Sequence, residues 1–241
     1  MTAESRRVAI VSHRDREAGE TAAPERGRFA AVFEALSALG ARPEAALYHD
    51  DCCDAVRRQL LQVDGVLVWV NPEEGGRDRS LLDAMLREVA AAGVFVSAHP
   101  DVILKMGTKE VLYETRTMSW GCDTHRYRSS ADLRRELPAG LAAGGAGVLK
   151  QNRGHGGDGV WKVELADRVG TDSGNGRMSM SSVGEMRLRV CHARRGSLDE
   201  VIPMSELVAR FEPYFGHGCM IDQAYQPRLS EGMIRCYLVQ D

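Results

Sequence analysis

A lysine that directly precedes a glycine-rich loop is the feature of this sequence with the clearest chemical meaning. Lys150 ends an apolar run, and residues 151–159 read Gln-Asn-Arg-Gly-His-Gly-Gly-Asp-Gly before apolar residues resume at Val160. Glycines let backbone N–H groups turn toward an anion in conformations with positive φ. An ammonium group supplies the point charge that a phosphate needs. The pattern therefore predicts a loop that holds phosphate groups.

Three kinds of glycine-rich loop fit these residues to different degrees. A P-loop places its lysine after the glycines, whereas Lys150 precedes them. Residues 154–159 match the dinucleotide pattern G-x-G-x-x-G, but that loop must open a helix, and β-branched and aromatic residues follow here. The third kind joins two antiparallel strands and folds over phosphates as a flap. A hairpin turn without a ligand fits the same residues, so the loop alone leaves these two interpretations open.

Composition limits the class of protein. The 241 residues can form one large or two ordinary domains, and the 44% hydrophobic and 27% charged fractions are typical of a globular protein. A net charge of −3 gives no electrostatic reason to expect nucleic acid. No apolar run approaches the ~20 residues of a membrane span, and the first residues do not form a signal peptide. The six cysteines show no C-x-x-C spacing, which favours reduced thiols and a cytoplasmic protein.

Residues 1–100 alternate between strand and helix patterns. Short β-branched runs predict strands, and apolar residues at helical spacing predict the helices between them. The expected strands cover 7–12, 44–49, 66–70 and 94–96, and the expected helices cover 28–39, 54–61 and 80–92, the last capped by Ser80. Such an alternation predicts an α/β domain with a parallel, doubly wound sheet.

In a sheet of this kind, the loops beyond the carboxyl ends of the strands carry the ligands. Here those loops are residues 12–14, 71–77 and 97–100, which are polar and rich in histidine and arginine. They suit an anionic substrate, although ordinary solvated loops explain each single residue equally well.

Residues 101–241 have a different character. Thr108 fits the N-cap of a helix that would begin with Lys109. The helix dipole disfavours a lysine there, so a bound anion would explain it; an ordinary exposed lysine is the other interpretation. A short helix is expected to end at Pro138, and a polar connection over 166–184. The other expected elements are strands over 146–150, 160–165, 185–192, 219–225 and 233–239 and a helix over 205–215.

The order of these elements resembles the ATP-grasp superfamily. The resemblance covers nearly the whole chain: an α/β domain, a helix that opens with a lysine, a second lysine before a glycine flap, a hairpin, a helix, a polar hinge, and a strand with an arginine. It implies a Rossmann-like pre-ATP-grasp domain with a parallel, doubly wound sheet over residues 1–100. It also implies an α+β ATP-grasp domain with an antiparallel sheet over 101–241, incomplete at its C-terminus.

The resemblance implies a role for each matched residue. Lys109 and Lys150 would contact the phosphates of ATP, and Lys150 would also lie near the adenine ring. The flap that closes over the phosphates would consist of Gly154, His155, Gly156, Gly157, Asp158 and Gly159. The hinge that presents backbone groups to the adenine edge would consist of Asp222, Gln223, Ala224 and Tyr225. Glu231 would bind the ribose, and Arg235 would act in catalysis by stabilising the transferred phosphoryl group.

The resemblance also implies a chemistry. Family enzymes use ATP and Mg²⁺ to activate a carboxylate as an acyl phosphate, which an amine then attacks to form a C–N bond. The expected partners are a small carboxylate and a small amine, without nucleic acid or membrane, and the sequence permits a homodimer. The family's metal ligands follow the strand of Arg235, so none is assigned here. We expect the chain to be the front part of a longer ligase. A non-catalytic nucleotide-binding protein and an ATP-grasp kinase are the alternatives.

Overall fold

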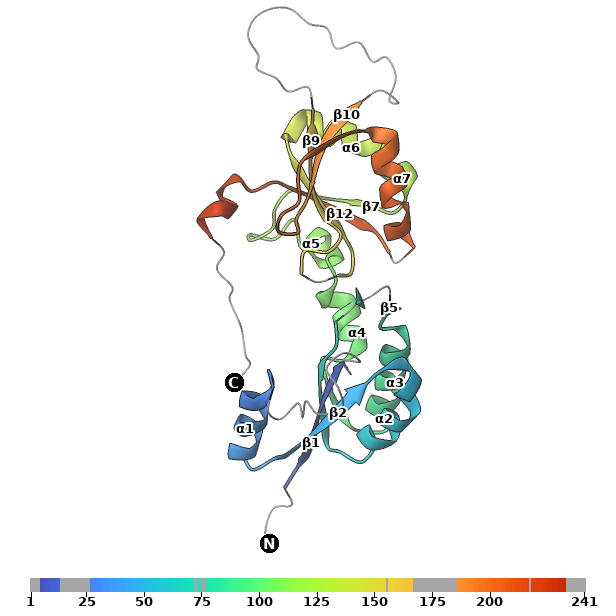
Figure 1. The fold of residues 1–241 in the computed structure, drawn as a ribbon, viewed down its shortest axis with the longest axis vertical. Coiled ribbons are helices and arrows are strands. Elements are labelled where there is room, and N and C mark those ends of the chain that lie inside the picture. Colours follow the sequence, from blue (N-terminus) through green and yellow to red (C-terminus); the bar gives the residue numbers. More distant parts are fainter. Residues whose placement is uncertain are drawn as a thin grey trace, which may run out of the picture. The chain divides into compact units, whose positions relative to one another are not determined.

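The computed structural model describes residues 5–13, 27–71, 73–74, 77–154, 156–166, 186–216 and 218–232. The chain divides into two compact units, Met1–Thr108 and Lys109–Asp241 (Figure 1). The boundary expected after residue 100 lies slightly earlier, inside the short helix α4 (Pro100–Val102). We describe each unit by itself.

The first unit is built on a four-stranded sheet whose neighbouring strands all run parallel. The strand order is β2-β1-β3-β6, so the chain moves from β1 to one side for β2 and to the other side for β3. The strands are β1 (Arg7–His13), β2 (Arg42–Tyr48), β3 (Gly65–Trp69) and β6 (Phe95–Ser97). This arrangement confirms the expected parallel, doubly wound sheet.

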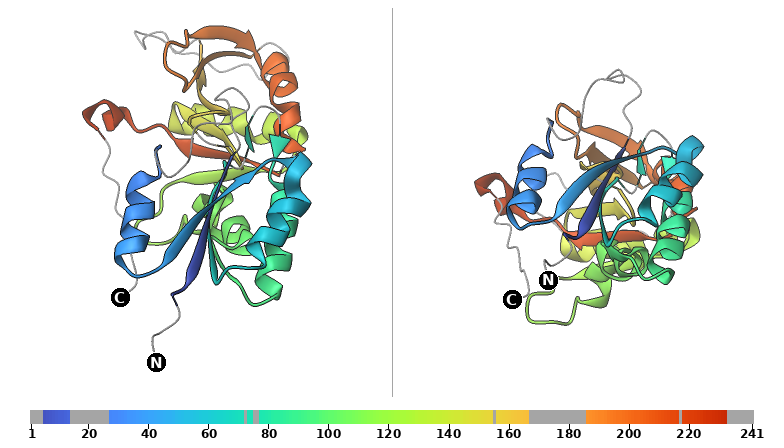
Figure 2. Two further views of the ribbon diagram at one scale, coloured as in Figure 1. Left: turned by 60° about the horizontal axis from the view of Figure 1, so that its bottom comes forward. Right: turned by 90° about the horizontal axis from the view of Figure 1, so that it is seen from below.

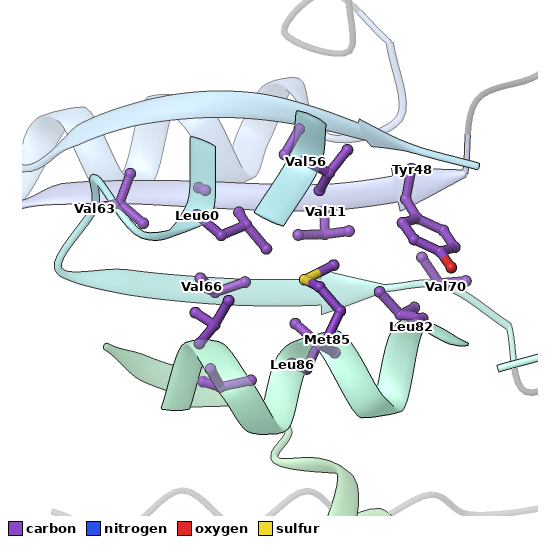
Figure 3. Close-up of a cluster of buried hydrophobic side chains, with 14 residues drawn as sticks. Val11, Tyr48, Val56, Leu60, Val63, Val66, Val70, Leu82, Met85 and Leu86 are labelled. Carbon is purple, nitrogen blue, oxygen red and sulfur yellow. The ribbon is translucent and has the colours of Figure 1, made fainter. Parts of the chain in front are cut away.

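Helices cover both faces of this sheet (Figure 2). α1 (Ala30–Ala38) lies on one face, where Phe33 packs with Ile10 and Phe29. α2 (Cys53–Leu60) and α3 (Ser80–Ala91) lie on the other face and enclose the larger core (Figure 3). The short elements of this unit are η2 (Asp50–Cys52), β4 (Glu73–Glu74), β5 (Arg77–Asp78) and η3 (Ile103–Gly107).

The second unit is built on a six-stranded sheet in which every neighbouring pair is antiparallel. The order is β11-β10-β9-β8-β12-β7. Its strands are β7 (Thr124–Tyr127), β8 (Gly147–Gln151), β9 (Val160–Leu165), β10 (Arg187–His192), β11 (Glu200–Pro203) and β12 (Met220–Ala224). Its helices are α5 (Glu110–Glu114), α6 (Ser130–Gly144) and α7 (Met204–Phe215), followed by the 3-10 helix η4 (Pro227–Glu231). The expected α+β domain with an antiparallel sheet is confirmed.

The two faces of this second sheet differ in character. The register of β8 with β9 and β12 puts Leu149, Val163 and Met220 on one face. They are fully buried there in one apolar core with leucines of α6 and α7. On the other face, Lys150 lies opposite Ile221, while Gln223 lies opposite Val148. The register therefore places Lys150 of β8, Lys162 of β9 and Gln223 of β12 on the face away from the α6–α7 core.

Three local expectations are wrong. Pro138 does not end a helix but lies inside α6, whose Leu133, Leu137 and Leu141 are spaced four residues apart and buried. This apolar face stabilises the helix despite the backbone hydrogen bond that proline cannot make. Ser80 does not cap α3; it is the first helical residue, and its N–H donates to Asp78 Oδ1 at 2.8 Å.

Thr108 does not cap α5. Its Oγ1 donates backward to the carbonyl of Leu104 at 3.4 Å, and Lys109 is the N-cap residue before the first helical residue, Glu110. The strands β7 and β11 have no counterpart among the elements expected from the sequence.

Some expectations fall on residues that the structure does not describe. These are the polar connection over 166–184, apart from Ala166 at its start, and the strand over 233–239. Within the described ranges, no helix combines the length and apolar character needed to cross a membrane.

Candidate functional site

Lys150 projects from β8 onto the polar face of the second sheet, where a chain of side chains holds it. Its Nζ donates a short hydrogen bond to Gln223 Oε1 on β12. The amide nitrogen of Gln223 in turn lies 2.9 Å from the sulfur of Cys122 and 3.3 Å from the hydroxyl of Thr124. Lys150 therefore has a defined position before any ligand binds.

Burial lowers the pKa of Lys150 from its ordinary value, although Cys122 and Asp222 act in the opposite direction. Desolvation disfavours the charged form of an amine. An anion beside Nζ would restore the lost stabilisation of the ammonium group. The position of Lys150 therefore favours a negatively charged ligand.

The glycine loop folds around a buried glutamine. The side chain of Gln151 is largely buried, and its Nε2 donates to the carbonyl of Asp158 at 3.2 Å. A Cβ at Gly154 would lie 2.5 Å from Nε2, and one at Gly159 would lie 2.3 Å from Cδ. These two glycines are required by the close approach of Gln151, which gives them a structural role independent of any ligand.

The glycines at the tip of the loop have a different environment. Gly156 has a φ of 61°, and a Cβ there would meet no heavy atom within 4 Å; Gly157 has a φ of 85° with only Ala193 nearby. Their backbone can present N–H groups to an anion without obstruction. Asp158, between them and Gly159, forms a short ion pair with Arg194 beyond β10. His155 lies outside the described residues.

Asn152, two residues after Lys150, accepts hydrogen bonds from the backbone at the start of α5. Its backbone carbonyl accepts the N–H of Lys109 at 2.9 Å, and its side-chain oxygen accepts the N–H of Glu110, also at 2.9 Å. Asn152 thus caps α5 from a distant part of the chain. The start of the glycine loop and the backbone of Lys109 are held together by two hydrogen bonds.

The hinge residues are divided between the two faces of the sheet. Asp222 lies on the core face, where its Oδ2 accepts a hydrogen bond from the hydroxyl of Tyr127 at 2.9 Å. Burial raises its pKa, although that hydrogen bond acts in the opposite direction. The side chain of Asp222 is therefore part of the core, and only its backbone is available for the role expected of it.

Gln223 lies on the polar face, opposite Val148, and Ala224 and Tyr225 follow it at the end of β12. The N–H groups of Ala224 and Tyr225 donate to the carbonyls of Asp123 at 3.4 Å and Ala146 at 2.9 Å. Lys162 lies over the ring of Tyr225, 4.8 Å from its centroid. An adenine ring that used a hinge N–H would have to displace one of these bonds, and the longer bond of Ala224 is the weaker one.

Glu231 and Arg235 are the two remaining residues expected at the site. Glu231 lies on η4 in an exposed ion pair with Arg228 at 2.7 Å. Arg235 lies outside the described residues. Among the residues that the structure describes, no group of three or more metal-ligating His, Cys, Asp or Glu side chains occurs. The roles of Glu231, Arg235 and the metal ligands thus stay predictions.

Sequence reasoning missed four residues of this site: Gln151, Asn152, Arg194 and Cys122. Gln151 and Asn152 directly follow Lys150, so their position in the sequence was a usable signal. Arg194 and Cys122 reach the site only through the pairing of strands, which no local pattern reveals.

No family model and no curated protein matches this chain. Among solved structures, the two-domain fold is similar to the crystal structure of D-cycloserine synthetase DcsG, with a TM-score of 0.56 at 12% sequence identity. The likeness covers 91% of this chain and 59% of that one, so this chain spans less than two thirds of that protein's length. At this identity the likeness shows the fold, and it supports an ATP-grasp-like architecture.

Proposed function

We propose that this chain binds ATP on the polar face around Lys150 and belongs to an ATP-dependent ligase that joins a carboxylate to an amine. One observation carries the proposal: a half-buried lysine of lowered pKa stands directly before a loop whose tip glycines are open and have positive φ. The ATP-grasp-like fold supports the same conclusion, and the similar structure is that of a synthetase.

The residues of this face fit a nucleoside triphosphate. Lys150 and Lys109 would supply positive charge to the phosphates, and the open backbone at Gly156 and Gly157 would supply N–H donors. Tyr225 offers an aromatic surface beside Lys162, and the hinge backbone would meet the adenine edge. For this fit, Lys150 must give up its hydrogen bond to Gln223 and donate to a phosphate oxygen instead. The phosphate oxygen is the stronger acceptor because it is charged.

Bound ATP with Mg²⁺ would supply the phosphoryl group that activates a carboxylate. The part of this chain is to orient the phosphates and to exclude water when residues 154–159 close. Arg235, Glu231 and His155 keep the roles that the resemblance implies, as part of the proposal. A cytoplasmic location, consistent with five free cysteines among the described residues, and a homodimer also belong to the proposal.

The proposal is tested by adding Mg–ATP and panels of carboxylates and amines to the full-length protein and measuring ADP and phosphate. We expect amine-dependent release of both products, and loss of that release in Lys150→Ala. Binding of ATP without turnover would instead support a non-catalytic nucleotide-binding protein. Phosphate transfer to a hydroxyl acceptor would support a kinase.

A further inference from the structure

The glycine loop and the turn that follows β10 lie side by side. Because β9 and β10 are antiparallel neighbours, His192 at the end of β10 lies opposite Trp161 near the start of β9. The N–H of Ala193 donates to the carbonyl of Val160 at 2.8 Å, and a Cβ at Gly157 would lie 3.7 Å from Ala193. The turn after β10 therefore packs against the tip of the glycine loop.

Arg194, the next residue of this turn, reaches the glycine loop with its side chain. Its Nη2 forms the short ion pair with Asp158 Oδ1, and its backbone N–H donates to His192 Nδ1 at 3.0 Å. Burial and the charge of Arg194 lower the pKa of His192, so the imidazole is uncharged near neutral pH and keeps its acceptor nitrogen. The backbone contact fixes the turn, and the ion pair fixes the guanidinium group beside Gly157.

The guanidinium group of Arg194 keeps donors for a ligand. The ion pair engages Nη2, and the side chain makes no other polar contact among the residues that the structure describes. The side chains of Arg194 and Asp158 are 62% and 50% exposed. An ion pair this exposed adds little stability because water screens it, so Arg194 can turn toward a phosphate at little cost in free energy.

The charge of the loop makes an arginine necessary there. An anion held by the N–H groups of Gly156 and Gly157 would lie beside the carboxylate of Asp158, which repels it. Arg194 offsets that charge and offers a planar set of donors that matches phosphate oxygens. The tip of the loop and Arg194 therefore form one anion-binding unit built from two turns.

We propose that Arg194 binds polyphosphate together with the N–H groups of Gly156 and Gly157. Asp158 positions the guanidinium group when no ligand is bound, and it competes with the phosphate for that group when a ligand arrives. That the polyphosphate belongs to ATP rests on the proposed function, because the inference adds a residue to the site around Lys150.

Isothermal titration of the 241-residue chain with ATP and with inorganic tripolyphosphate, both in EDTA, tests this inference. EDTA removes divalent cations, so Asp158 cannot act through a bound metal. We expect Arg194→Ala to bind both probes about tenfold more weakly, since a charge-assisted contact is lost. Arg194→Lys keeps the charge and should recover part of the loss. The matched control is Arg134→Ala, at an exposed position on α6 over the other face of the sheet, and it should leave both affinities unchanged.

The variant Asp158→Asn separates phosphate binding from a purely structural role of the ion pair. If the pair only kept the loop in shape, Asp158→Asn would weaken binding of both probes, as Arg194→Ala does. If Arg194 binds phosphate, Asp158→Asn frees its guanidinium group and removes a repelling charge. We therefore expect both probes to bind this variant about threefold more tightly, the size of effect that an exposed ion pair has. Unchanged or weaker binding to Asp158→Asn, or unchanged binding to Arg194→Ala, would overturn the inference.

The same titrations distinguish this inference from the proposed function. If ATP binding is lost in Lys150→Ala but unchanged in Arg194→Ala, the inference fails alone. If the wild-type chain binds tripolyphosphate through Arg194 but does not bind ATP, the proposed function fails and the inference stands. Binding of neither probe to the wild type would contradict both.

Discussion

Lys150 would make the proposed ATP binding depend on pH. Because burial lowers its pKa below the ordinary 10.5, the free protein loses the proton of Lys150 as pH rises toward that value. A bound phosphate stabilises the ammonium group and raises the pKa in the complex. ATP affinity should therefore be constant near neutral pH and fall as pH rises through the pKa of the free protein.

The measurement is the dissociation constant of ATP from neutral pH to pH 10.5 in the wild type and in Lys150→Arg. The guanidinium group keeps its charge over this range, so the arginine variant should show a flat profile. The same alkaline loss in both proteins would mean that another group titrates.

The glycines of the loop separate into two roles that can be measured. Gly159→Ala places a Cβ 2.3 Å from the side chain of Gln151, whereas Gly156→Ala meets no neighbour; the two glycines have nearly equal φ, 62° and 61°. Backbone strain alone costs about 1–2 kcal/mol in either variant. We expect Gly159→Ala to lower the free energy of unfolding by clearly more than Gly156→Ala in urea titrations.

Adding Gln151→Ala to Gly159→Ala should recover the excess loss, because it removes the side chain that collides. Equal losses in the two single variants would contradict the role given to Gln151. The sequence alone could not predict which glycines contact Gln151 and which are open to a ligand. The motif predicted a phosphate loop, but glycine serves a close contact and a ligand equally well, so the residue type alone cannot assign either role.

Among elements, α5 depends on a distant residue for its start. Asn152→Ala removes the acceptor of the Glu110 N–H, and loss of a cap costs about 1 kcal/mol. The variant keeps the backbone carbonyl that accepts the Lys109 N–H, but the lost bond to Glu110 loosens the first turn of α5 beside Lys109, so we expect ATP affinity to fall as well. Asn152→Asp keeps the acceptor oxygen and should restore stability, as measured by thermal unfolding and ATP titration of both variants. Full ATP affinity in Asn152→Ala would show that α5 does not position Lys109.

Pro138 gives a second prediction for an element. Pro138→Ala would restore a backbone donor inside α6, and we expect a gain of about 2 kcal/mol in the free energy of unfolding. Pro100→Ala is the control, because Pro100 is the first residue of α4, where no intrahelical hydrogen bond is lost. A gain at Pro100 equal to that at Pro138 would contradict this explanation.

Most of the elements could be predicted from local patterns, and the exceptions have a common cause. The β-branched run of β3 and the apolar spacing of α3 are local signals, and both appear where expected. β7 has the sequence Thr-His-Arg-Tyr, which carries no alternation of apolar residues. It is a strand because β12 pairs with it and α5 packs on it through the ion pair of Arg126 and Glu110. The predicted cap at Thr108 failed similarly, since Asn152 replaces it from another part of the chain.

On the scale of the whole molecule, each unit has an apolar core of its own. ATP that binds on the polar face of the second sheet should therefore protect that sheet selectively. We predict slower amide hydrogen exchange in β8 and β12 after ATP is added, and unchanged exchange in β1 and β3. Slower exchange in the first unit alone would mean that ATP binds there, and it would contradict the proposed site around Lys150.

The order of lysine, glycine loop and hinge supported the ATP-grasp resemblance at this scale, and the fold agrees with it. The sequence could not supply the partners of Lys150. Its contact with Gln223 depends on the register of β8 against β12, which joins residues far apart in the chain.

The most direct test of ATP binding at Lys150 is isothermal titration of ATP into the wild-type chain, Lys150→Ala and the control Lys105→Ala. Lys105 is exposed on η3 in the first unit. We predict that ATP binds the wild type and the control equally, and binds Lys150→Ala at least about tenfold more weakly because a charge-assisted contact is lost. Equal affinity in wild type and Lys150→Ala, or no binding to the wild type, would contradict the proposed site.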